Sequence, residues 1–317
     1  MIQETNQSFV QYINSRIKVR FGAGKNVVFG QNIVAGSRIS GLGSGLDDLD
    51  SIVAINTPNV ENSLMGFGLG MMLSGTDSIF LMKQHDFALL GLDQLTNTVN
   101  LVRTLDLSSS FIVMMVVVDS GYEGPQSSLN NLDEFASLSR SPVHFLNTRN
   151  NIDVAFRASR KPGLHFMVLS QSDMKKNLID FSIESEVIDS GELVRTNSTS
   201  EVLIVYFGLN LSYLFEIHNE FIDLQLNTDL LIVGRLQQNL EIEEDLLRGY
   251  KSILIVNTSK SEISYAQKLA FEISRLHKVT YIKRMPSSNW GYVFEDLPEI
   301  APLEVVRLWK ESKESKL

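Results

Sequence analysis

The sequence contains no cysteine and only five histidines among its 317 residues. Without cysteine the chain cannot form disulfide bonds, a thiolate metal site or a thiol nucleophile. Long hydrophobic runs are also missing: the longest, Phe111–Val118, is far too short to span a bilayer. The first residues lack the basic and then apolar pattern of a signal peptide. We therefore expect a cytoplasmic protein with no membrane partner.

Positive charge is scarce as well. The chain has 28 Lys and Arg residues against 37 Asp and Glu residues, which gives a net charge of −9. A surface that binds nucleic acid or an anionic membrane needs a basic patch, so we expect neither partner. The histidines show no metal-ligand spacing such as His-x-x-x-His. We expect His144 and His165 in apolar core strands, and His218 and His277 on the surface of helices.

What the sequence does contain is a regular alternation of apolar strands and helices. Its hydrophobic content of 44% and its length are typical of a soluble protein with two globular domains. Continuous apolar strands such as 111–118 are expected where both faces of a sheet are covered. The alternation predicts an α/β protein with two doubly wound, mostly parallel domains. The expected domains are 1–175 and 201–317, joined by a polar linker at 176–200.

The stretch 56–94 carries the most specific pattern. It begins with Asn56-Thr-Pro-Asn-Val-Glu61, which leaves a strand and enters a helix predicted over 61–74. We expect Asn59 to cap this helix and Glu61 to lie in its first turn, where the helix dipole favours a carboxylate. A second helix is predicted over 88–102.

Three glycines, Gly66, Gly68 and Gly70, lie inside the first of these helices. Each one costs about 1 kcal/mol relative to alanine in a helix interior. We expect that close packing against another backbone or against a ligand offsets this cost. Phe87 and the pair Asp93-Gln94 follow at the end of the stretch.

The order of Thr-Pro-x-x-Glu, Gly-x-x-x-Gly-x-x-x-x-Gly, an aromatic residue and Asp-Gln resembles one family. It is similar to the beta subunit of the thiamine-diphosphate-dependent component of 2-oxo acid dehydrogenases, of the pyruvate dehydrogenase type, and to the pyrimidine-binding half of transketolase. The resemblance is strong over 56–94 and is one of architecture alone after residue 200. It implies a pyrimidine-binding domain over 1–175 and a transketolase C-terminal-like domain over 201–317.

The resemblance also implies roles for several residues. In that family a glutamate at the start of this helix protonates the cofactor's pyrimidine ring, and Glu61 occupies the matching position. Phe87 matches the aromatic residue that stacks on the aminopyrimidine. Asp93 and Gln94 match a pair that we expect at a subunit interface. Two plainer alternatives stay open: Glu61 only complements the helix dipole, and Phe87 is an ordinary core residue.

Half of the family's cofactor site has no counterpart in this chain. The family binds the diphosphate and magnesium through Gly-Asp-Gly followed by Asn, and no Asp-Gly dipeptide occurs here. The resemblance therefore implies that the Mg²⁺ ligands come from a separate alpha-type subunit, in an α2β2 heterotetramer. Thiamine diphosphate would lie across the interface between the two subunits.

A second departure lies at Gly124-Pro-Gln-Ser-Ser128, which resembles the family's Gly-Pro-Gln-His-Ser. Gln126 and Ser127 are candidate substrate-loop residues, and Ser127 stands where the family has a histidine. That histidine helps to transfer the acyl group to a lipoyl arm, and serine cannot titrate near neutral pH. The reaction intermediate is then passed to a lipoyl arm or to an aldehyde or ketone, or it is protonated. Alternatively, the loop has diverged and a partner residue takes over.

His85 lies two residues before Phe87, at a family position that is usually aromatic. It is a candidate acid–base residue, or its imidazole only fills the space of the aromatic ring. The expected function is that of a beta-type subunit acting on a small 2-oxo acid or ketol donor, by decarboxylation or by acyl or ketol transfer. The alternative is a non-catalytic scaffold or regulatory paralogue of such a subunit.

Overall fold

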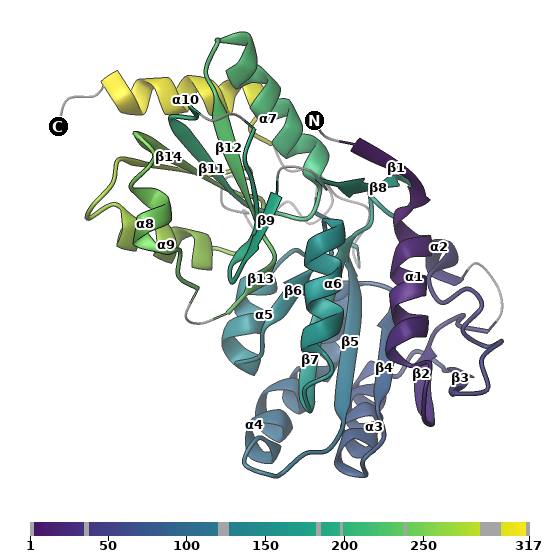
Figure 1. Cartoon of the computed structure of the whole chain (residues 1–317). Helices are drawn as coiled ribbons and strands as arrows, with labels where there is room; N and C mark the ends of the chain where they lie inside the picture. The colour runs from purple at the N-terminus through teal and green to yellow at the C-terminus, as the bar shows by residue number, and fades with distance from the viewer. Residues whose placement is uncertain are drawn as a thin grey trace.

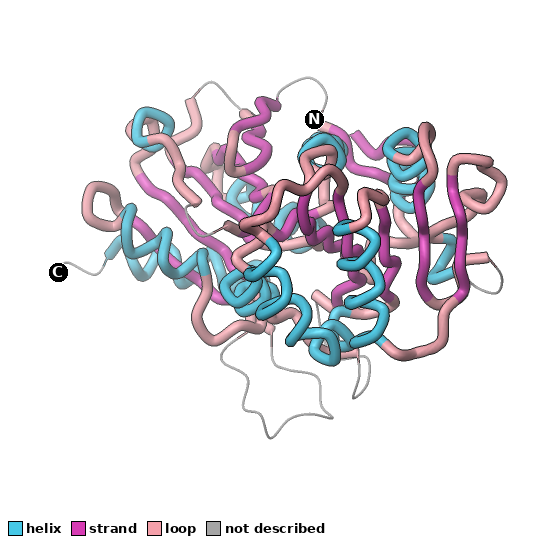
Figure 2. Tube along the Cα trace, turned by 90° about the horizontal axis from the view of Figure 1, so that it is seen from below, coloured by secondary structure: helices cyan, strands magenta, loops and turns pink. Residues whose placement is uncertain are grey.

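The computed structural model describes residues 3–34, 38–119, 127–181, 185–196, 199–237, 240–285 and 299–314. Within these residues the chain forms two α/β units that lie side by side, each built around one large sheet (Figure 1). Figure 2 shows the same chain from below, with its helices in cyan and its strands in magenta. The predicted fold class, two doubly wound and mostly parallel α/β domains, is confirmed.

The sheet of the first unit has seven strands. In spatial order they are β13 (Arg235–Leu236), β6 (Val143–Phe145), β7 (Gly163–Ser170), β5 (Ser110–Val117), β4 (Ser78–Met82), β2 (Asn26–Gly30) and β3 (Ile52–Asn56). All pairs are parallel except β13 with β6. Every residue of β5 is buried, as predicted for a strand that is covered on both faces.

Helices cover both faces of this first sheet. On one face lie α1 (Phe9–Arg20) and α6 (Arg149–Ala158), and on the other lie α3 (Glu61–Leu73) and α5 (Leu132–Ser139). Successive side chains of a strand point to opposite faces, so Ile112 of β5 packs with the first pair of helices and Val113 with the second. A short helix α2 (Arg38–Gly41) and a two-stranded sheet of β1 (Gln3–Ser8) and β8 (Asn177–Asp180) flank the unit.

The sheet of the second unit has six strands. In spatial order they are β15 (Val279–Lys283), β14 (Ser252–Asn257), β11 (Val202–Phe207), β12 (Thr228–Val233), β10 (Gly191–Val194) and β9 (Ser185–Ile188). The first four are the parallel strands that the sequence predicts. Strands β10 and β9 form an antiparallel edge from within the stretch 176–200. That stretch therefore contains regular structure, and the proposed domain boundaries stay a prediction.

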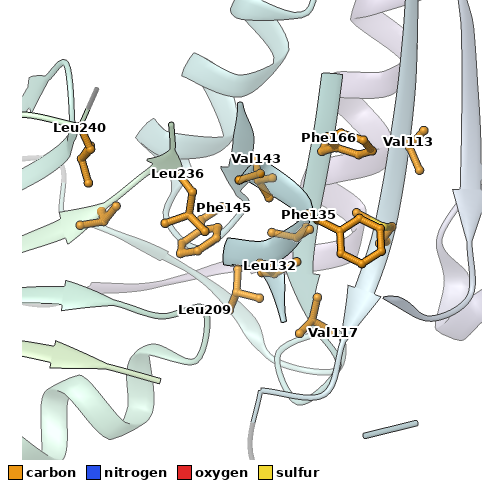
Figure 3. Packing of buried hydrophobic residues seen from close by; sticks show 14 of the residues in the cluster. Val113, Val117, Leu132, Phe135, Val143, Phe145, Phe166, Leu209, Leu236 and Leu240 are labelled. Carbon is orange, nitrogen blue, oxygen red and sulfur yellow. The ribbon is translucent and has the colours of Figure 1, made fainter. Parts of the chain in front are cut away.

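The two units share one hydrophobic core. Helices α7 (Leu211–Asp223) and α10 (Pro302–Glu314) cover the outer face of the second sheet, and α8 (Glu244–Leu247) and α9 (Tyr265–Ile273) cover the face that continues into the first unit. Leu132 and Phe145 of the first unit belong to the same cluster as Leu209 and Leu236, which follow β11 and β12 (Figure 3). This continuous packing fixes the second unit against α5 and the loop before it.

The helix predicted over 88–102 is present, but its winding is irregular. Residues 85–102 are helical throughout and form a 3₁₀ helix, η1 (His85–Gly91), a π-helical turn, η2 (Gln94–Thr98), and α4 (Val99–Val102). A prediction for one histidine is wrong. His218, predicted at the surface, is buried because its Nδ1 shares a 2.6 Å hydrogen bond with Thr228 Oγ1. His144 and His165 are core residues, as predicted.

Candidate functional site

The predicted site residues gather at the carboxyl edge of the first sheet. Because β2, β3, β4 and β5 are parallel, their C-terminal ends lie at one edge, where α/β proteins commonly bind ligands. Gln31 follows β2, Glu61 follows β3, His85 follows β4 and Asp119 follows β5. The first two are in direct contact: Gln31 Nε2 donates to Glu61 Oε1 at 3.3 Å.

Glu61 begins α3 and is only 4% exposed. The Thr57 N–H bonds the Gly30 carbonyl at 3.0 Å, which ties the turn before α3 to the end of β2. Within the described chain no basic side chain pairs with Glu61, and no group bonds its Oε2. The Oε2 atom is not among the fully buried side-chain atoms that lack a partner, so it is open to a ligand's donor. This opening, together with its place at the carboxyl edge of the sheet, makes Glu61 a candidate functional group.

The predicted cap of α3 is wrong. Its N-cap residue is Val60, without a side-chain hydrogen bond, and Asn59 is exposed. The turn at Pro58 closes with a 3.1 Å bond from the Val60 N–H to the Pro58 carbonyl, which leaves Asn59 one residue outside the cap position.

Close packing explains one of the three helix glycines. A Cβ atom at Gly68 would lie 2.1 Å from the Phe111 ring, so the helix backbone rests directly on β5. Gly66 has ordinary space around it, and nothing lies within 4 Å of a Cβ at Gly70. Packing against the protein therefore does not explain these two, and a ligand contact there stays a prediction. Gly91 makes a second close contact, since a Cβ there would lie 2.4 Å from Met65 and 3.6 Å from the Glu61 carbonyl. The end of η1 thus touches the first turn of α3.

His85 and Phe87, both on η1, have different surroundings. His85 is fully buried edge-on against Phe135, with ring centroids 4.6 Å apart, and neither ring nitrogen has a well-formed hydrogen bond within the described chain. Burial lowers the pKa of His85 to about 4, so the imidazole is neutral at pH 7. Phe87 is half-buried on the same core and stays partly accessible. This geometry favours a packing role for His85. Phe87 is accessible enough to stack on the ring of a ligand.

The loop that carries Ser127 is held from two sides. Asp86 accepts hydrogen bonds from the backbone N–H groups of Ser128, at 3.1 Å, and Leu129, at 3.3 Å. From the second unit, Lys260 Nζ donates to the Ser128 carbonyl. Ser127 itself is half-buried. Gln126, the other candidate residue of this loop, lies outside the described residues.

Lys260 is a residue that the sequence analysis missed. It is 6% exposed, and burial lowers the pKa of its ammonium group to about 8, although Asp86 and Asp119 act in the opposite direction. Its own N–H bonds the Asn130 carbonyl at 2.9 Å, and the Asn130 amide bonds the Thr258 carbonyl at 3.1 Å. No motif could have indicated it, because Lys260 and Ser128 lie 132 positions apart.

Asp119 is a second buried carboxyl at this edge. Ser170 Oγ donates to its Oδ1 at 2.8 Å, and within the described chain its Oδ2 has no partner. Burial, reinforced by the nearby Asp173, raises the pKa of Asp119 to about 6. The edge therefore holds two buried carboxyls, Glu61 and Asp119, and neither forms an ion pair with a described residue.

Asp93 and Gln94, predicted at an interface, lie at the start of η2. Asp93 is exposed and accepts from Asn97, and the Gln94 side chain bonds Thr98 and lies beside Gly66. In the part of the chain that the structure describes, no group of three or more histidines and carboxylates could hold a metal ion. No helix among the described residues is both long enough and apolar enough to cross a membrane.

No protein-family profile and no curated protein matches the sequence, but solved structures share its fold. A split-gene transketolase, described as an inactive β4 tetramer, matches with a TM-score of 0.65 and 11% identity over 97% of this chain and 98% of that chain. A transketolase from Campylobacter jejuni matches with a TM-score of 0.65 and 12% identity over 98% of this chain and 45% of that chain.

A third match is the 2-oxoglutarate:ferredoxin oxidoreductase from Magnetococcus marinus with 2-oxoglutarate, coenzyme A and succinyl-CoA bound. Its TM-score is 0.59 at 9% identity, over 98% of this chain and 65% of that chain. At such low identities the likeness shows the fold alone. The resemblance predicted from the sequence is thus confirmed at the level of the fold, which is transketolase-like over nearly the whole chain.

Proposed function

We propose that this chain is the beta-type subunit of a two-subunit thiamine-diphosphate enzyme. The reaction is a decarboxylation, or an acyl or ketol transfer, from a 2-oxo acid or ketol donor. The observation that carries the proposal is Glu61, a glutamate buried at the start of α3 with one carboxyl oxygen that no described residue bonds. The transketolase-like fold supports it, because the family that the motif around Glu61 resembles is related to transketolase.

The residues at this edge fit the aminopyrimidine half of thiamine diphosphate. When bound, the cofactor supplies a thiazolium carbon that becomes nucleophilic once it loses its proton. Glu61 holds a proton on the pyrimidine ring nitrogen, and burial strengthens that hydrogen bond by excluding water. Phe87 stacks on the ring from the adjoining element η1, a contact worth about 1 kcal/mol beyond area burial. The contact between Gly91 and the first turn of α3 keeps the two elements together.

The loop at Ser127 orients the substrate in this proposal. Asp86 and Lys260 fix its backbone next to Phe87, so the second unit takes part in shaping the site. Serine does not titrate near neutral pH, and neither does the buried His85, which we assign to packing. A proton needed later in the reaction then comes from the substrate, from water or from the partner subunit.

The other half of the cofactor site belongs to the partner. The sequence has no diphosphate motif, so we assign the diphosphate contacts and the Mg²⁺ ligands to an alpha-type subunit. Helix α3 and η1 expose Phe67, Leu73, Leu89 and Leu90, each roughly half accessible. Exposed apolar side chains of this kind mark a protein interface. An α2β2 assembly buries them and closes the site over Glu61.

A non-catalytic role for the chain is the second candidate. It is favoured by the absence of any histidine in the described site that titrates near neutral pH. A solved structure of this fold is described as an inactive β4 tetramer, so a beta-type chain can assemble without activity. The two candidates differ in what they require of Glu61: only the enzyme needs its carboxyl.

Calorimetric titration with thiamine diphosphate and Mg²⁺ tests the two-subunit proposal. The chain alone should show no saturable binding, because it holds only the pyrimidine half of the site. The complex with a co-expressed alpha-type chain that carries Gly-Asp-Gly should bind the cofactor with about one site per pair. Tight binding by the chain alone, or no binding by the complex, contradicts the proposal.

A further inference from the structure

A second polar cavity lies on the opposite side of the first unit. It is a groove of about 320 Å³ between α1 and α6, which pack on the face of the sheet that α3 does not cover (Figure 1). Its polar lining consists of Arg16, Arg20, Asn150, Asp153, Arg157 and Arg160. Arg20 bonds Ser110, the first residue of β5, so the groove reaches the amino edge of the strands. It is therefore separate from the site at Glu61.

The groove concentrates positive charge on an acidic chain. Four arginines line it against a single carboxylate, whereas the whole chain carries a net charge of −9. Asp153 neutralises Arg16 with a 2.7 Å ion pair, and Asp77 neutralises Arg20 at 2.9 Å. Arg157 and Arg160 are exposed and pair with no carboxylate among the described residues. Two positive charges are thus left over in a concave surface, which focuses their field on an anion.

Arg20, which also lines the groove, is held in place by its own bonds. Its side chain is 7% exposed, and its two terminal nitrogens bond Asp77, Ser110 Oγ and the Ser159 carbonyl. It is therefore a fixed part of the wall of the groove, and the unpaired charge comes from Arg157 and Arg160.

We propose that this groove binds the phosphate group of a small organic phosphate. The planar fork of arginine matches the geometry of phosphate oxygens, and Arg157 and Arg160 contribute two such forks to a groove that Arg20 also lines. Val19 on the rim offers an apolar surface for the rest of such a molecule. This ligand is distinct from the proposed cofactor, because the groove and Glu61 lie at opposite edges of the sheet.

Isothermal titration of the full chain with inorganic pyrophosphate tests this site. We expect saturable binding with a dissociation constant below about 1 mM. The variant R157A/R160A should bind at least about tenfold more weakly, since it loses both charge-assisted forks. Both side chains are exposed, so its melting temperature should stay that of the wild type. Citrate, which carries similar charge on carboxylates, should bind more weakly than pyrophosphate.

The matched control is R248A/R307A, which removes the same two charges from exposed helices of the second unit. This variant should keep the wild-type affinity for pyrophosphate, because it changes the net charge of the chain but leaves the arginines of the groove in place. The proposal is overturned if the wild type shows no saturable binding, or if R157A/R160A binds like the wild type. Equal losses in the two double variants, or citrate binding as tightly as pyrophosphate, also overturn it.

Discussion

Buried ionisable side chains have different partners at the two edges of the first sheet. At the amino edge, the nearly buried Arg20 is bonded to Asp77, Ser110 and the Ser159 carbonyl. At the carboxyl edge, Glu61 and Asp119 are as deeply buried, yet neither forms an ion pair with a described residue. The same sheet thus carries a buried cation paired with a carboxylate at one edge and two buried carboxyls without a cation at the other.

This difference suggests that the amino edge contributes to stability and the carboxyl edge to function. Buried charges that are paired and bonded hold elements together, and removing one partner is strongly destabilising. Buried carboxyls without a cation cost stability, and they persist where a ligand or a reaction needs them. Changes at the amino edge should therefore weaken the fold. Changes at the carboxyl edge should alter the chemistry and leave the stability equal or higher.

The largest expected effect on stability is at Arg20. Replacing Arg20→Met keeps the aliphatic stem but leaves Asp77 without its cation, and we expect a loss of about 3 kcal/mol in unfolding free energy. Urea unfolding followed by circular dichroism measures it. Arg157→Met on α6 is the control and should change stability by less than about 0.5 kcal/mol, because that side chain is exposed. An equally stable Arg20→Met chain would contradict the assignment of the amino edge to stability.

The second effect has the opposite sign and depends on pH. The pKa of Asp119 is raised from 3.8 to about 6 in the folded chain, so folding favours its protonated form. The cost of its charge is absent below the unfolded pKa and grows as pH rises through this window to the folded pKa. Asp119→Asn removes that cost, so it should stabilise the chain by about 3 kcal/mol at pH 8.

Below about pH 3 the wild type and Asp119→Asn should have the same stability, because the aspartate is then mostly neutral in both states. Thermal unfolding of both proteins across this pH range gives the comparison directly. A variant that is less stable than the wild type at pH 8 would show that Asp119 is satisfied in the native state.

The smallest expected effect is at His85. Phenylalanine fills the same space beside Phe135 and removes two buried nitrogens without hydrogen bonds, so His85→Phe should stabilise the chain by about 1 kcal/mol or less. The pH profile of the assembled enzyme should keep its shape near pH 6 to 7, because His85 titrates near about 4. Loss of a limb in that pH range, with cofactor binding intact, would restore the acid–base role.

The pattern of these residues shows what the sequence could predict. The place of Glu61 in the first turn of α3 was predictable because its motif is local: a turn at Pro58, a helix start and spaced glycines lie within a few residues. The strands were predictable because a sheet covered on both faces demands continuous apolar runs such as β5. The fold class follows from the order of these elements.

The failures come from contacts between distant segments. The segment predicted as one regular helix over 88–102 is a 3₁₀ helix up to Gly91, which lies close to Met65 of α3, and helical periodicity does not predict this change of winding. His218 is buried on α7, where its imidazole shares a hydrogen bond with Thr228 of β12. Lys260 reaches the Ser128 loop only because the two units share a core. Local patterns predict elements, whereas such contacts depend on how the elements pack.

The role of Glu61 is tested most directly by proton exchange on the bound cofactor. In the assembled complex in D₂O, acid quenching and NMR measure how fast the thiazolium carbon exchanges its proton, with no knowledge of the substrate. Glu61→Gln keeps the shape but cannot hold the ring proton, so exchange should slow by at least about 100-fold. Glu192→Gln changes an equally buried glutamate of the second unit and should exchange like the wild type. Unchanged exchange in Glu61→Gln, with cofactor bound, would contradict the account.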